Sequence, residues 1–247
     1  MRDGEISQFL AGTVRDWGLR RAFVAGIICL PIGIALGAVG LGVLNRHLYG
    51  RFANREQIAE QLQAIVLVFS ILLSLVIAWR LRRTNQKGAA ALYLMFTLGL
   101  IFLTGEEIAW GQRIFHLRTP ESIKEINSQG EISLHNVVGY QELFNYFQLL
   151  VGAYGVILPL ALPRMKTLKR KWEAVSLLVP PHSLIPYFLP MFLWKVSRFL
   201  NPPPHAHMYF LHTYNEVMEL DLYLGFFFFC WYQLRKLRKI GTHPLPS

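Results

Sequence analysis

The sequence predicts an all-α fold, a membrane helix bundle with about six transmembrane helices. Of its 247 residues, 53% are hydrophobic and only 16% are charged, against about 25% charged residues in a typical soluble domain. The mean hydropathy is positive, +0.33. Apolar residues also form runs of the length, about 20 residues, that crosses the roughly 30 Å hydrocarbon core of a bilayer as a helix. We therefore expect one integral membrane domain over residues 1–247, with the lipid bilayer as its main partner.

Six apolar runs have the length and composition of spanning helices. In chain order they are residues 22–44, 62–82, 88–107, 141–163, 173–199 and 209–234. A polar lead-in over residues 1–21, without a signal-peptide cleavage site, precedes the first run, and a basic tail over residues 235–247 follows the last. The fifth run contains Pro180, Pro181, Pro186 and Pro190, so we expect this helix to be kinked or broken.

Basic residues predict the orientation of the chain. The net charge is +10, and the basic residues form short clusters between alternate runs. These clusters are Arg15, Arg20 and Arg21; Arg80, Arg82, Arg83 and Lys87; Arg164, Lys166, Lys169, Arg170 and Lys171; and Arg235, Lys236, Arg238 and Lys239. By the positive-inside rule, both termini are cytoplasmic in a multi-pass protein. Because the charge is spread over loops and is not gathered on one face, it does not indicate a nucleic-acid partner.

Carboxylates interrupt two of the apolar runs. Glu106 and Glu107 end the third run, and Glu216 and Glu219 lie in the first turns of the sixth. Each carboxylate inside a bilayer costs roughly 2.5–3.5 kcal/mol on insertion scales, so such residues are functional candidates. The predicted topology places all four near the outer face. We therefore expect one outward-facing site, with Glu106, Glu107 and Glu216 as its catalytic carboxylates.

The segment over residues 104–140 is predicted to be an ordered cap on the outer face. Residues 107–115 have the composition of a helix that continues past the membrane surface, and Thr119-Pro120-Glu121 resembles a capped helix start. Long connections of this kind are commonly functional. The substrate-binding candidates in and beside this segment are Trp110, Gln112, Arg113, Asn136 and Tyr223.

Residues 106–136 carry a spaced pattern, E-E-x-x-W-G-Q-R-I-F, then T-P-E, Q-G-E and L-H-N. It resembles the signature of an uncharacterised group of bacterial multi-pass membrane proteins, which implies a bacterial cytoplasmic (inner) membrane protein and no particular reaction. More loosely, paired glutamates followed by Arg113 resemble the CAAX-type glutamic membrane proteases, and His212-xxx-Glu216 resembles their last motif. The gap before the arginine is longer here, and no F-x-x-x-H element of that family is evident.

Histidines suggest a divalent metal ion as a cofactor. His212, Glu216 and Glu219 share one helical stripe, and His135 lies in the predicted cap, so these four residues are the candidate metal ligands. Imidazole and carboxylate together suit zinc or a transition metal, although the spacing matches no known zinc signature.

Two metal-free interpretations stay open beside it. A glutamate with a raised pKa can act as a general base with histidine as its partner. Alternatively, the acids only form ion pairs, Glu106 with Arg113, and Glu216 or Glu219 with Lys195 or Arg198.

Three functions follow from these interpretations. The first is a metal-assisted hydrolase or transferase that acts on a lipid, a lipid-linked intermediate or a membrane peptide. The second is a transporter or an ion- or proton-binding protein, in which the acids and the broken fifth helix form the site. The third is a non-catalytic subunit that docks other membrane subunits through residues 104–140.

Overall fold

The computed structural model describes residues 3–53, 58–127, 130–135, 137, 139–164, 175–200 and 208–241. Within these ranges the regular elements are helices, joined by turns and short irregular segments, with an isolated antiparallel bridge between Asn127 and Val137. The elements in chain order are α1 (Asp3–Trp17), α2 (Arg21–Leu44), α3 (Arg46–Ala53), α4 (Ile58–Arg83), α5 (Lys87–Glu107), η1 (Ala109–Gly111), α6 (Gln112–Phe115), α7 (Glu121–Lys124), α8 (Tyr140–Ala161), η2 (Leu162–Arg164), η4 (His182–Leu184), α10 (Ile185–Leu200) and α11 (Met208–Gly241).

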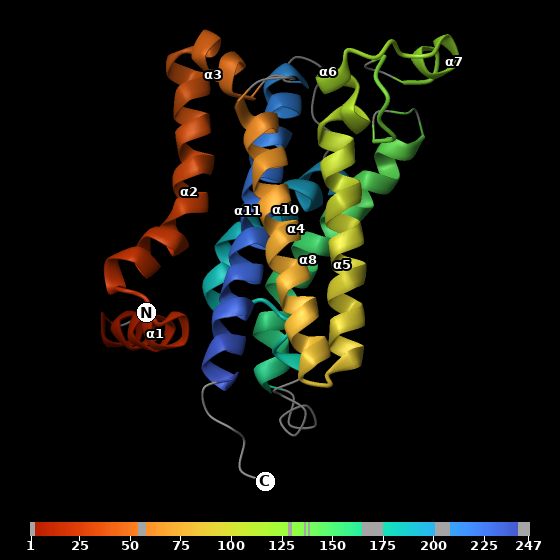
Figure 1. Cartoon of the computed structure of the whole chain (residues 1–247). Helices are drawn as coiled ribbons and strands as arrows, with labels where there is room; N and C mark the ends of the chain where they lie inside the picture. Colours follow the sequence, from red (N-terminus) through yellow and green to blue (C-terminus); the bar gives the residue numbers. More distant parts are fainter. Residues whose placement is uncertain are drawn as a thin grey trace.

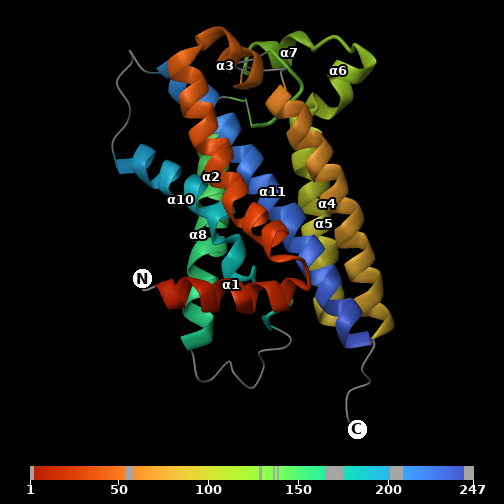
Figure 2. The ribbon, with the colours of Figure 1, turned by 90° about the vertical axis from the view of Figure 1, so that its left-hand side faces the viewer.

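The long helices form a bundle in which α11 is central (Figure 1). α4 packs against both α5 and α11, while α10 packs against α8 and α11, and α2 lies on α11 and α10. The short helices α3, α6 and α7 gather at one end of the bundle. α1 lies across the bundle axis toward the other end (Figure 2). The two ends therefore have different architectures.

Four helices among the described residues are long and apolar enough to cross a membrane. They lie within Arg21–Leu44, Arg46–Arg83, Lys87–Glu107 and Tyr140–Arg164. Only 17–33% of the residues in their most apolar windows are buried inside the protein. Because the remaining apolar side chains need a non-aqueous environment, the protein has the features of a helical membrane protein.

The fifth and sixth apolar runs differ from simple spans. α10 begins only at Ile185, after the short 3₁₀ turn η4, and has 16 residues. Pro180 and Pro181 precede η4, and neither can donate an intrahelical hydrogen bond. The part of the predicted run over residues 173–174 lies outside the described residues. α11 extends to Gly241 and has 34 residues, so it continues well beyond the predicted end at residue 234.

The predicted continuation of the third helix through Phe115 is wrong. α5 ends at Glu107, and Ala109, Trp110 and Gly111 all have positive φ values, 46°, 52° and 84°. This left-handed turn is costly for residues other than glycine. It folds the Trp110 ring back onto Gly105, where a Cβ atom would lie 2.9 Å from the ring. The close approach therefore requires glycine at position 105.

Proline inside α2 creates a buried acceptor that another helix satisfies. Pro31 has no N–H group, so the carbonyl of Ile27, four residues earlier, loses its intrahelical donor. The hydroxyl of Tyr187 on α10 donates to that carbonyl at 2.7 Å, and Tyr187 is fully buried. In an apolar environment each such backbone group needs a partner, so this bond ties α2 to the bundle.

Tyr187→Phe is predicted to lower the free energy of unfolding by about 1–3 kcal/mol, because it leaves the Ile27 carbonyl buried and without its donor. The measurement is reversible unfolding in mixed micelles. Tyr146→Phe is the matched control, since Tyr146 is half-exposed and stacks on Phe199 with ring centres 4.8 Å apart. Equal stabilities of the two variants would contradict the role assigned to Tyr187.

Candidate functional site

Glu106 and Glu107 occupy an unfavourable place for negative charge. They are the last two residues of α5, where the helix dipole disfavours anions. Glu106 is also 97% buried, with 3% of its surface exposed. A buried carboxylate is costly unless hydrogen-bond donors surround it. Because neither the helix dipole nor water stabilises Glu106 here, its hydrogen-bond partners must do so.

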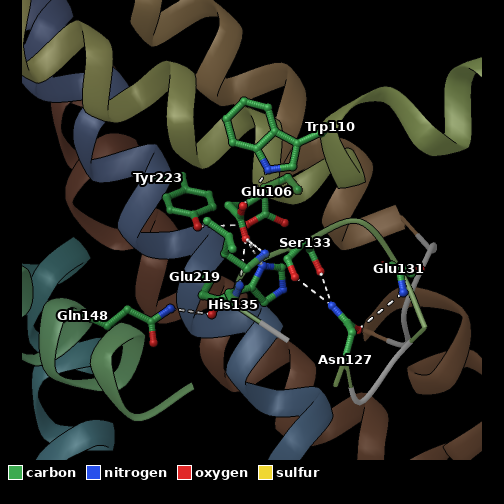
Figure 3. A network of polar contacts seen from close by, with 11 residues as sticks. Glu106, Trp110, Asn127, Glu131, Ser133, His135, Gln148, Glu219 and Tyr223 are labelled. Atoms are coloured by element: carbon green, nitrogen blue, oxygen red, sulfur yellow. Dashed lines mark hydrogen bonds and ion pairs between the residues drawn. The ribbon is translucent and has the colours of Figure 1, made fainter. Parts of the chain in front are cut away.

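The carboxylate of Glu106 accepts four hydrogen bonds (Figure 3). One oxygen, Oε1, accepts from the Trp110 indole N–H at 2.6 Å. The other, Oε2, accepts from the backbone N–H groups of Leu134 and His135 at 2.7 and 2.8 Å. It also lies 3.0 Å from Nδ1 of the His135 ring. Glu106 therefore joins the end of α5 to a segment 28 and 29 residues further along the chain.

Gln112 holds the same connecting segment, which we define as residues 108–139. Its amide nitrogen donates to the Thr119 hydroxyl at 2.6 Å, and its amide oxygen accepts from the Ile132 N–H at 2.7 Å. Thr119 in turn donates to the Gly130 carbonyl at 2.7 Å. Thr119 was expected to cap the helix after it, but it closes this loop instead, and α7 begins without a side-chain cap.

Asn127 fixes the turn that presents His135. Its amide nitrogen donates to the Ser133 carbonyl at 2.7 Å, and its amide oxygen accepts from the Glu131 N–H at 3.4 Å. Asn127 and Ser133 are both buried. Side-chain amides therefore supply the hydrogen bonds that regular secondary structure would otherwise provide here, and the His135 ring is positioned by a bonded framework.

Glu107 points toward α11. Its Oε1 accepts a hydrogen bond from the Tyr223 hydroxyl at 2.8 Å. It also interacts electrostatically with Glu219, His135 and Glu60. The end of α5 and the first half of α11 thus share one polar region.

Glu219 is bound by neutral amides. Its Oε1 accepts from Gln148 on α8 at 2.5 Å and from Asn215, one helical turn earlier, at 2.6 Å. The buried ammonium group of Lys195 donates to the side-chain oxygens of Asn215 and Asn145, at 2.9 and 2.7 Å. The expected contact between Lys195 and Glu219 is therefore indirect, with Asn215 between them.

Glu216 completes a cluster of acids. Gln63 on α4 donates to the Glu216 backbone carbonyl at 2.8 Å and lies 3.4 Å from its carboxylate. Glu216 interacts electrostatically with Glu219, Glu107 and Glu60. Four carboxyl groups from α4, α5 and α11 consequently influence one another within the bundle.

Sequence reasoning missed the polar residues that serve the cluster from α4 and α8. Glu60 and Gln63 are buried although they lie in an otherwise apolar helix, as is Gln148. Polar residues at positions where a span should be apolar are the signal that would have found them. A further acid, Asp221, is fully buried on α11. Neither of its carboxyl oxygens has a hydrogen-bond partner among the described residues.

The structure brings five of the predicted site residues into direct contact or close to one another: Glu106, Glu107, Trp110, His135 and Tyr223, with Glu216 and Glu219 adjoining them. Gln112 instead bonds within the connecting segment. Asn136 and the side chains of Arg113 and His212 lie outside the described part of the chain. The pairing of Glu106 with Arg113 therefore stays a prediction.

The metal hypothesis finds no converging donor set in the part of the chain that is described. No group of three or more His, Cys, Asp or Glu residues there has the geometry to hold a metal ion. Nδ1 of His135 faces Glu106, and Oε1 of Glu219 is held by two amides. These described donors do not fit a shared metal, and His212, the fourth predicted ligand, has no described side chain.

Charges around His135 favour its protonated form. Burial lowers the pKa of the imidazole, but the hydrogen bond with Glu106 and the negative charges of Glu107 and Glu219 outweigh this effect. The pKa of His135 therefore lies above its usual value of 6.5. The ring is 34% exposed, whereas the carboxylate beside it is 2% exposed, so the imidazole is the accessible member of the pair.

Comparisons of this chain with protein-family models, with curated proteins and with solved structures find no match. The resemblances carried by residues 106–136 thus remain predictions, and the geometry of the site carries the functional argument.

The imidazole of His135 is predicted to titrate above pH 6.5 in the folded protein, and Glu106→Gln should lower that pKa. Because folding favours the charged ring, this contribution to the free energy of unfolding is complete below pH 6.5. It is lost as the pH rises through the folded-state pKa. NMR of histidine-labelled protein measures the titration, with exposed Glu142→Gln as the control. A wild-type pKa at or below 6.5, or one unaffected by Glu106→Gln, would contradict this account.

Proposed function

We propose that this protein is a membrane-embedded enzyme in which His135 is the acid–base catalyst and Glu106 positions it. The reaction is hydrolysis or group transfer on a lipid, a lipid-linked intermediate or a membrane peptide. The observation that carries the proposal is the 3.0 Å contact between Nδ1 of a part-exposed imidazole and a buried carboxylate. A carboxylate in this position fixes the tautomer and orientation of the ring and stabilises the imidazolium that forms.

The chemistry proposed for the pair is proton transfer. With its Nδ1–H donated to Glu106, neutral His135 has Nε2 as its basic nitrogen. In the proposed reaction Nε2 takes a proton from water or a substrate hydroxyl as that group attacks, and returns the proton to the leaving group. Glu106 stays ionised throughout, because its remaining oxygen capacity is held by Trp110 and the two backbone N–H groups.

The proposal includes a membrane arrangement. α10 and α11 join the four long apolar helices as the fifth and sixth spans of a bacterial cytoplasmic membrane protein, and residues 104–140 cap the outer face. Two observations support it. Arg80, Arg82 and Arg83 end α4, and Arg235 lies near the end of α11. These ends lie toward α1, away from α6 and α7 (Figures 1 and 2). The positive-inside rule then makes both termini cytoplasmic.

A second function is favoured by the acid cluster. Glu107 and Glu216 interact electrostatically with Glu60, Glu219 and each other, and the described contacts of the cluster include the Tyr223 hydroxyl at Glu107 and the Gln148 amide at Glu219. Like charges this close inside a membrane do not all ionise, so the cluster is suited to hold protons. A proton-coupled transporter would use Glu107, Glu216 and Glu219 in this way, with the buried Asp221 as a further acid.

One experiment tests the enzyme and separates it from the transporter. The protein is reconstituted into vesicles of bacterial lipid extract that contain a pH-sensitive dye, and lipids are followed by mass spectrometry. We expect the wild type to convert a lipid species. His135→Ala should lower the rate at least about 100-fold, the usual size of general acid–base catalysis. Exposed His116→Asn is the control within the same segment.

The enzyme and the transporter predict different readouts, lipid conversion for the first and proton transport for the second. Conversion that depends on His135 and Glu106 supports the enzyme. Lipids that match those of protein-free vesicles, together with dye acidification abolished by Glu107→Gln, would overturn the enzyme and favour the transporter.

A further inference from the structure

A cavity lies toward the opposite end of the bundle from Glu106. Its volume is about 590 Å³, and α1 forms one wall, with Phe9, Gly12 and Asp16 among the lining residues. The remaining walls come from α8, α11, η4 and the residues before η4. This volume falls within the roughly 300–1,000 Å³ of small-molecule sites. None of the residues of the proposed catalytic site lines it.

Interactions at the end of α1 hold this cavity open. Trp17 is fully buried, and its indole N–H donates to the hydroxyl of Ser183 at 3.0 Å. Its ring meets Tyr232 and Trp231 edge-on, with centroids 5.1 and 5.7 Å apart. Arg235 donates to the Trp17 carbonyl at 2.9 Å, which compensates the C-terminal end of α1. Because these contacts fix the C-terminal end of α1, the cavity beside the middle of α1 is a feature of the folded chain.

The lining includes a lysine and an aspartate from different elements. Lys236 of α11 donates to the hydroxyl of Ser176 at 2.6 Å, so both groups stand at the wall. Asp16 comes from α1 and interacts electrostatically with Tyr232. Phe9 and Val179 supply an apolar part of the wall. The cavity lining thus combines an acidic and a basic side chain from two helices with apolar surface.

We propose that this cavity binds the headgroup of a phospholipid that carries both a phosphate and a primary ammonium group. The phosphate lies against Lys236 and Ser176, the ammonium group lies against Asp16, and the glycerol and first acyl carbons lie along Phe9 and Val179. A lipid is the source because α1 lies across the bundle (Figure 2), the orientation of a helix in the membrane interface. A purely anionic lipid offers nothing to Asp16, and a free headgroup offers nothing to the apolar wall.

Native mass spectrometry of the purified full chain in detergent tests the proposal, with added phosphatidylethanolamine, phosphatidylglycerol or soluble phosphoethanolamine. We expect one tightly retained phosphatidylethanolamine. Lys236→Ala should weaken its binding about tenfold, the effect of losing a charge-assisted contact of about 1.4 kcal/mol. Asp16→Asn should remove the preference over phosphatidylglycerol. Arg238→Ala, which removes an exposed cation two residues away on α11, is the control.

Gly12→Leu blocks the cavity without replacing a polar group. A Cβ atom at Gly12 meets nothing within 4 Å, and leucine favours helix, so this variant should keep the melting temperature and lose the lipid. Unchanged retention in Gly12→Leu and Lys236→Ala would overturn the proposal. So would a preference for phosphatidylglycerol, or equal binding of soluble phosphoethanolamine. None of these results depends on His135, so they leave the proposed reaction untouched.

Discussion

The carboxylate of Glu106 is the group on which the arrangement of the site depends. It lies away from water at the end of a helix whose dipole disfavours it, and N–H donors from Trp110, Leu134 and His135 compensate it. Two of these donors are backbone groups 28 and 29 residues away. The hydrogen bonds that stabilise the Glu106 carboxylate are therefore the same bonds that hold the connecting segment. An apolar residue at position 106 would remove these bonds and release the segment.

The acids of the site also differ in the partners that compensate their charge. Glu106 has four donors, one of them an imidazole that gains a charge, whereas the described contacts of Glu107, Glu216 and Glu219 include neutral hydroxyl and amide groups. Lys195 is connected to Glu219 through the side-chain amide of Asn215. Partly buried acids bound in this way rarely increase stability over apolar residues of similar size. The two proposed functions would account for their presence, one through proton transfer at His135 and the other through proton storage in the cluster.

Much of the fold follows from local sequence, because an apolar run and its length determine a span without reference to the rest of the chain. The first run, predicted over residues 22–44, forms α2 over Arg21–Leu44, and the third ends at Glu107 as expected. The turn after Glu107 was not predictable in this way. It depends on Trp110 packing over Gly105, a contact that exists only once the helix has ended.

The candidate site was predictable in part for a similar reason. Alternating spans bring the end of α5 and the first half of α11 to the same end, so the proximity of Glu107 and Tyr223 follows from topology. The donors to the acids depend instead on which helices lie side by side. Gln63 and Gln148 reach α11 because α4 packs on it and α8 packs on α10 beside it. The periodicity of polar and apolar residues within one helix does not predict which helices pack side by side.

Hydrogen exchange at two backbone amides tests the central claim most directly. In the wild type the N–H groups of Leu134 and His135 should be protected, because both donate to a buried carboxylate. Glu106→Gln weakens charge-assisted bonds worth about 1.5–3 kcal/mol, so exchange at these two amides should become at least about tenfold faster. Exposed Glu142→Gln should leave both rates unchanged. Equal rates at Leu134 and His135 in the wild type and in Glu106→Gln would contradict the account, because Glu106 would then not hold the segment that carries His135.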